Sequence, residues 1–156
     1  MVPALAVAVL AYALDQVTKL WVERTMELGE SVTVVPGLLR WHYILNPGAA
    51  FSIGEDHTWV FTVIQAVVAV AGLAALFRAR SLPWALALGG LVGGVLGNLT
   101  DRLFRPPSFG QGHVVDMISV PRFAVFNVAD SFIVCSILAI ALLVMTGRRL
   151  DGTREA

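Results

Sequence analysis

The chain has 156 residues, of which 57% are hydrophobic and only 14% are charged, and its formal net charge is zero. Soluble domains carry about 25% charged residues, so this composition excludes an ordinary soluble domain and indicates a membrane protein. Zero net charge argues against a nucleic-acid-binding protein, which needs a basic surface. The length allows one domain with a few membrane spans, and the single cysteine, Cys135, excludes an internal disulfide.

Four stretches are apolar enough to cross a bilayer, which takes about 20 helical residues. Two of them are uncharged, and the last is interrupted only by Asp130. We therefore predict an all-α membrane protein in which residues 1–156 form a single integral membrane domain. The predicted spans are 3–23, 58–77, 81–101 and 125–147.

The first span carries two charges, Asp15 and Lys19, in its second half. Residues four apart lie on one helix face, so the two can pair, which lowers the cost of burying each. Residues 2–13 could instead be a cleaved signal peptide, since residues 11–13 (Ala-Tyr-Ala) resemble a cleavage site. The start lacks a basic residue and the helical pattern continues to Trp21, which favours a retained span.

The loop after the first span, 24–57, contains two β-prone runs, Ser31–Leu39 and Arg40–Leu45. The turn signal Pro36-Gly37 interrupts them. This pattern predicts a small β-like platform at the membrane surface.

The arginines indicate the orientation by their density. Five lie on each side of the predicted membrane, so a count does not decide. Arg78 and Arg80, however, crowd the very short connection between the second and third spans, and dense arginines in short loops favour the cytoplasm. We therefore expect both termini inside and the loops 24–57 and 102–124 outside.

The third span contains Gly89, Gly93 and Gly97 at a spacing of four. Such a stripe of small residues lets another helix approach closely, either within one chain or between two copies. Close packing there would fix Asn98 and Asp101 at the outer end of the helix.

Asp116 and Asp130 lie at the edge of an apolar run, where an ionisable group costs roughly 2.5–3.5 kcal/mol and usually has a function. Because Pro121 separates them, no single helix carries both, and 117–126 is expected to be a loop that returns the chain to the membrane. Two close carboxylates of low exposure share a proton, as in an aspartic protease. The alternative is that they cap or solvate a helix end, for which Asp130 is well placed. The residues alone leave both open.

Asn98 and Asn127 each stand three residues before an aspartate, Asp101 and Asp130 respectively. Residues three apart share a helix face, so each asparagine is expected to orient its own aspartate or to bind substrate backbone.

Five short motifs combine these residues in order over most of the chain. They are DQVTK (15–19), NPGAAF (46–51), GNLTDR (97–102), VVD (114–116) and FNVAD (126–130). In this combination the chain resembles lipoprotein signal peptidase, also called signal peptidase II. Two features depart from that family pattern: a lengthened segment, 104–110, and Met117 in place of the more usual phenylalanine.

The resemblance implies a four-span aspartic peptidase of the bacterial inner membrane, with its active site near the outer face. It would cut prolipoproteins just before a diacylglyceryl-modified cysteine, with Asp116 and Asp130 as the catalytic pair and no metal or cofactor. Expected partners are lipidated prolipoprotein substrates, membrane lipids and globomycin-type inhibitors, but no nucleic acid, and a monomer is expected.

The resemblance also extends to other polar positions. It implies a supporting role for Asp101 near Arg102, and a structural role for Asp15 and Lys19 in holding the first span. The platform is expected to clamp the substrate from above. The implied substrate-binding residues are Asn46, Gly48, Asn98, Arg102 and Asn127.

Two other functions compete with this one. A metal-dependent lipid-headgroup transferase would need several carboxylates at helical spacing, which the chain lacks. A small proton or cation transporter would need ionisable residues through the bilayer midplane. Apart from Asp15 and Lys19, those residues gather at one face.

Overall fold

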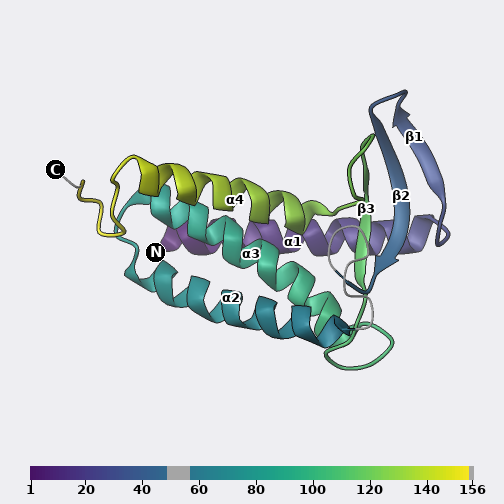
Figure 1. The fold of residues 1–156 in the computed structure, drawn as a ribbon, viewed down its shortest axis with the longest axis horizontal. Coiled ribbons are helices and arrows are strands. Elements are labelled where there is room, and N and C mark those ends of the chain that lie inside the picture. The colour runs from purple at the N-terminus through teal and green to yellow at the C-terminus, as the bar shows by residue number, and fades with distance from the viewer. Residues whose placement is uncertain (49–56, 155–156) are drawn as a thin grey trace.

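A computed structural model describes residues 1–48 and 57–154, so motif residues 49–51 lie outside the described residues. The chain begins with helix α1, followed by a hairpin, two helices, a third strand and a last helix (Figure 1). The helices lie within three residues of the predicted spans at either end. The elements are α1 (Val2–Thr25), β1 (Ser31–Val35), β2 (Leu39–Asn46), α2 (Thr58–Arg78), α3 (Leu82–Phe104), β3 (Val114–Ser119) and α4 (Val128–Met145).

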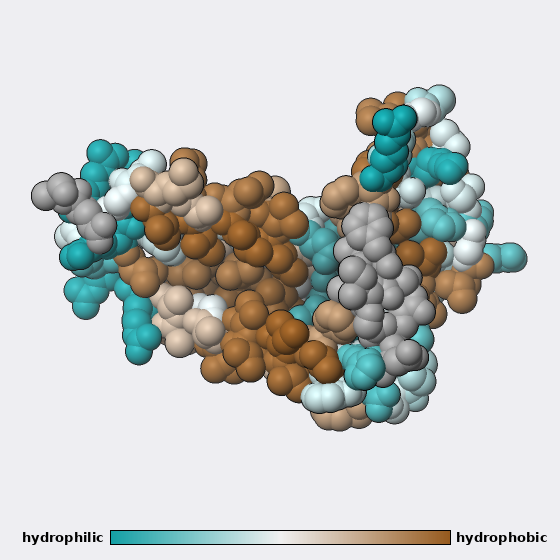
Figure 2. Space-filling view, viewed as in Figure 1, coloured by the Kyte–Doolittle hydropathy of each residue, from teal (hydrophilic) through white to brown (hydrophobic). Residues whose placement is uncertain are grey.

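Among the described residues, four helices are long and apolar enough to cross a membrane. They run side by side, with the strands at one end of the bundle and both termini at the other (Figure 1). Figure 2 shows an apolar surface over the helices, with hydrophilic residues gathered at the two ends. The protein is therefore a multi-pass membrane protein, as its composition predicts.

Helix α3 is the centre of the bundle, because it packs against each of the other three helices. The glycine stripe makes this possible: a Cβ added at Gly93 would lie 2.8 Å from the Cβ of Ala11 on α1. On the neighbouring face, a Cβ at Gly94 would lie 2.7 Å from the carbonyl oxygen of Ala129 on α4. The stripe thus packs within the chain, against two helices at once.

The three strands form one antiparallel sheet in the order β1-β2-β3. The hairpin of β1 and β2 confirms the platform predicted in the first outer loop. The prediction that Met117 begins a returning loop was wrong, because β3 continues to Ser119 and joins the same sheet. Residues 114–117 of this strand are buried without alternation, so the period-two pattern that reveals a half-exposed strand is missing.

A buried cluster of charges joins α1 to α3. The ammonium of Lys19 lies 2.8 Å from a carboxylate oxygen of Asp15 and 2.8 Å from one of Asp101, and all three side chains have no exposed surface. The Nε of Arg105 lies 2.7 Å from the other oxygen of Asp101. Two buried carboxylates therefore face two cations, of which Arg105 also pairs with Glu23, and this pairing offsets the cost of burying them. The predicted pairing of Asp15 with Lys19 is confirmed.

The cluster makes a prediction for stability. Lys19→Met leaves Asp15 buried without its cation, and removing one partner of a buried pair costs about 3–5 kcal/mol. Thermal unfolding in detergent should show a marked loss of stability. The double variant Asp15→Asn/Lys19→Met should recover part of it, because Asp101 keeps Arg105. A Lys19→Met protein as stable as the unaltered chain would contradict this account.

Candidate active site

A cavity of about 330 Å³ lies where the sheet meets the ends of α2, α3 and α4 that are opposite the chain termini. It brings together Asp116 and Asp130, which the sequence places on separate elements, and it contains most of the polar residues predicted for the site. Its polar lining includes Asn46, Gly48, Asn98, Arg102, Asp116 and Asp130. Asn127 is not one of the lining residues, but it contacts both carboxylates.

Asp116 is fixed by the sheet. It lies on β3, two residues along from the partner of Asn46 on β2, because Ile44 is paired with Asp116 and Asn46 with Val114. Diagonal neighbours on one face of a sheet are within reach of each other, and the Asn46 amide donates a hydrogen bond of 2.9 Å to Asp116 Oδ2. Asn127 Nδ2 donates one of 2.7 Å to Oδ1. The carboxylate is only 2% exposed.

Asp130 is fixed by the start of α4. Asn127 is the N-cap residue, and its Oδ1 accepts a hydrogen bond from the Asp130 amide while its own amide donates to Asp130 Oδ2. This reciprocal arrangement is a capping box. The other oxygen of Asp130 accepts 2.7 Å from Asn98 Nδ2 and belongs to the cavity lining. Capping and a place in the site, which the sequence presents as alternatives, thus occur together at one residue.

The prediction that each asparagine orients its own aspartate holds for Asn127, through the capping box with Asp130, and was wrong for Asn98. Asn98 donates to Asp130 rather than to Asp101, and the Asn127 amide group donates to Asp116 and to Asn98. The reason is that Asp101 is already paired with Lys19 and Arg105.

Lys19 connects the buried charge cluster to the cavity. Its Nζ donates 2.9 Å to Asn98 Oδ1, which also accepts 3.0 Å from Asn127 Nδ2. With its oxygen held by two donors, Asn98 must direct its NH₂ group at Asp130.

Asp101 lies outside the cavity lining and contacts different groups from those expected. It pairs with Lys19 and Arg105, and its Oδ2 accepts 3.3 Å from the amide of Val115. That last bond ties β3, next to Asp116, to α3. Its contacts therefore support the position of Asp116 rather than that of Arg102.

Arg102 lies on the wall of the cavity, buried on α3. Its guanidinium donates 3.1 Å to the carbonyl oxygen of Pro47 and also donates to that of Gly48. Its centre lies 5.5 Å from the ring centroid of Phe61, a cation–π distance. Arg102 therefore anchors the chain just after β2 against the bundle and places Gly48 at the cavity.

The position of Asp116 changes its acidity. Its pKa is raised to about 7, chiefly because the side chain is buried and secondly because Asp130 repels a second negative charge. The hydrogen bonds from Asn46 and Asn127 act in the opposite direction. At neutral pH this carboxyl group can both hold and release a proton, which suits it for acid–base catalysis.

Gln65 is a cavity residue that sequence reasoning missed. It lies on α2, and its buried Oε1 has no hydrogen-bond partner among the described residues. Buried amide oxygens nearly always have a partner, so this one is available to a ligand. A signal was present in the sequence: Gln65 is a lone amide in an otherwise apolar span.

The family comparison covers nearly the whole chain. Residues 7–146 match the family model described as signal peptidase (SPase) II. The lipoprotein signal peptidase of Leifsonia xyli is 47% identical over 96% of this chain and 69% of its own length. That of Streptomyces coelicolor is 49% identical over 95% of this chain and 72% of its own length.

Solved structures agree with these sequence matches. A bacterial membrane enzyme determined by the in meso method at 2.3 Å resolution superposes with a TM-score of 0.83, at 28% identity over 98% of this chain and 93% of that one. A second, at 1.9 Å resolution, has a TM-score of 0.79 and 29% identity over 91% and 92% of the two chains. Together with the family match, they show that this chain belongs to the signal peptidase II family.

Proposed function

We propose that this peptidase removes the signal peptide from diacylglyceryl-modified prolipoproteins, cutting just before the lipidated cysteine, with Asp116 and Asp130 as its catalytic pair. The relatives it matches are named lipoprotein signal peptidases. The observation that carries the assignment of the pair is that both carboxylates line one cavity, each oriented by a different asparagine. Because the chain belongs to this family, the peptidase function is preferred over the transferase and transporter alternatives.

The pair works by sharing one proton. The ionised carboxylate removes a proton from water as the water oxygen attacks the scissile carbonyl carbon, and the protonated carboxyl donates its proton to the carbonyl oxygen. The resulting gem-diol collapses, the C–N bond breaks, and a proton passes to the leaving amine. The products are the carboxylate of the signal peptide and the free amino group of the lipidated cysteine. Asp116, whose pKa is raised to about 7, suits either role.

The neighbouring groups would hold the substrate backbone. Gly48 and Asn46 come from the platform, and Arg102 fixes the position of the Gly48 carbonyl. Gln65 Oε1 lines the same cavity and has no partner among the described residues, so it can accept a hydrogen bond from a substrate amide. An extended peptide held by these groups would pass the two carboxylates while the platform excludes bulk water.

The lipid anchor explains the location of the site. A diacylglyceryl-modified cysteine stays in the bilayer, so its scissile bond is held close to the membrane surface. The cavity lies at the end of the bundle opposite the termini (Figure 1). We therefore propose cytoplasmic termini, an active site near the outer face of the inner membrane, a monomeric enzyme, and inhibition by globomycin-type compounds that occupy this cavity.

The first prediction from the proposed function concerns the catalytic pair. Asp116→Asn and Asp130→Asn keep shape but cannot share a proton, so each should lower the cleavage rate by at least about 100-fold. The assay is cleavage of a diacylglyceryl-modified prolipoprotein in detergent with a chelator present. Asp151→Asn, an exposed carboxylate at the far end, is the matched control and should cleave normally. Activity that survives in either site variant would break the assignment and direct attention to Asp101.

The second prediction concerns pH. Because the folded-state pKa of Asp116 is raised to about 7, the shared proton is held below that pH and lost above it. The value of kcat/KM should therefore fall as pH rises through about 7, approaching tenfold per unit. A mechanism that uses metal-bound hydroxide would show the opposite, a rate that rises over the same range.

The third prediction concerns Gln65. Gln65→Leu removes an acceptor that has no partner among the described residues, so thermal stability should be unchanged or higher. If the acceptor binds substrate, KM should rise by about 2- to 10-fold, the value of one hydrogen bond, with kcat little changed. An unaltered KM would show that Gln65 does not contact the substrate.

A further inference from the structure

A second cavity, larger than the one that holds the carboxylates, lies on the sheet. Its volume is about 620 Å³, within the range of small-molecule sites. It opens between the turn that joins β1 to β2 and the loop that follows β3, and Phe123 lines both cavities. The proposed peptidase reaction does not use it.

Two arginines give this cavity a positive charge. Arg40 lies at the start of β2, paired in register with Ser119, and Arg122 lies three residues further along. Neither forms an ion pair with another described residue, and the lining contains no acidic side chain. Two guanidinium groups without a counter-charge favour a phosphate or carboxylate ligand.

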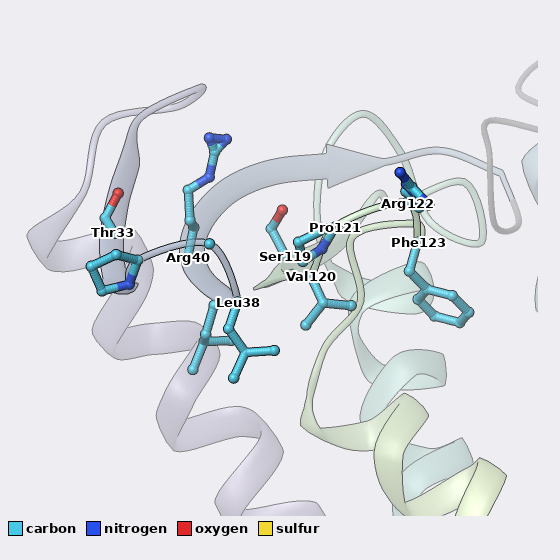
Figure 3. A pocket seen from close by; sticks show the side chains of 11 residues that line it. Thr33, Leu38, Arg40, Ser119, Val120, Pro121, Arg122 and Phe123 are labelled. Carbon is cyan, nitrogen blue, oxygen red and sulfur yellow. The ribbon is translucent and has the colours of Figure 1, made fainter.

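The other side of the cavity is apolar. Figure 3 shows Leu38, Val120 and Phe123 directed toward the helices, while the nitrogen atoms of Arg40 and Arg122 lie on the side away from them. Leu38 and Phe123 are each 62% exposed within the protein. Positive groups therefore lie above apolar side chains at the end of a membrane-spanning bundle.

This arrangement matches one class of ligand. A phospholipid at the membrane surface presents its phosphate above and its acyl chains below, in the same order as the arginines and the apolar side chains. A free anion would use only the arginines, and a soluble peptide would leave the apolar side chains directed into lipid. The charge favours an anionic phospholipid, such as phosphatidylglycerol, over a zwitterionic one.

We propose that the cavity between the β1–β2 turn and the loop after β3 binds the headgroup of an anionic phospholipid through Arg40 and Arg122, with Leu38, Val120 and Phe123 against its acyl chains. The bound lipid would lie beside the active-site cavity, on the far side of Phe123. It would hold the platform against the membrane surface.

Lipid binding can be measured without any peptidase assay, so its failure is distinct from failure of the proposed function. The purified chain in neutral detergent is mixed with phosphatidylglycerol or with phosphatidylcholine of identical acyl chains, and retained lipid is quantified by mass spectrometry. The unaltered chain should retain phosphatidylglycerol in clear excess. Arg40→Gln and Arg122→Gln should each lower retention about fivefold, and Arg40→Lys/Arg122→Lys should restore part of it.

The controls distinguish a specific lipid-binding site from a general electrostatic attraction between anionic lipid and arginines. Arg24→Gln removes an exposed arginine at the same end of the bundle, outside the cavity, and should leave retention unchanged. Equal retention of the two lipids, or equal losses in the Arg24 and Arg40 variants, would overturn the proposal. So would displacement of the lipid by millimolar inorganic phosphate, which would identify a simple anion site. Thermal unfolding of each variant confirms that it is folded.

Discussion

The ammonium of Lys19 is the interaction on which the rest of the structure depends. It lies fully buried between Asp15 and Asp101, and it also holds the oxygen of Asn98. Asp15 in turn accepts a hydrogen bond from the amide of Ala129 on α4, and Asp101 accepts one from Val115 on β3. One cation therefore sets the positions of three helices and of the strand that carries Asp116.

The carboxylates of this cluster are ion-paired, whereas the two carboxylates of the cavity form no ion pair with a described residue. Its own carboxylates are neutralised by Lys19 and Arg105, whereas Asp116 and Asp130 receive their direct side-chain hydrogen bonds from neutral asparagines. A neutral donor orients a carboxylate without fixing it in the charged form as firmly as a cation would. Burial can then raise the pKa of Asp116 to about 7. Asp116 can therefore hold a proton close to neutral pH.

The sequence alone predicts much of this protein, and the failures have physical causes. Four spans, the hairpin platform, the pairing of Asp15 with Lys19 and the glycine stripe all follow from local patterns. Strand β3 does not, because burial on both faces hides its alternation. The contact of Asn98 with Asp130 instead of Asp101 is also not predicted, since it depends on how two helix ends meet. The lack of a partner for the Gln65 oxygen, within the part of the chain that the structure describes, is a property of the folded cavity.

The most direct test of the central claim is the titration of the two carboxyl groups that are proposed to be catalytic. Infrared difference spectroscopy on protein with ¹³C-labelled aspartate carboxyls can follow protonated carboxyl as pH is raised. The account predicts a protonated aspartate that ionises within about one unit of pH 7, and whose signal is missing in Asp116→Asn. If every aspartate in the folded protein were already ionised at pH 5, the two carboxylates would share no proton at working pH, and the aspartic mechanism assigned to this cavity would be wrong.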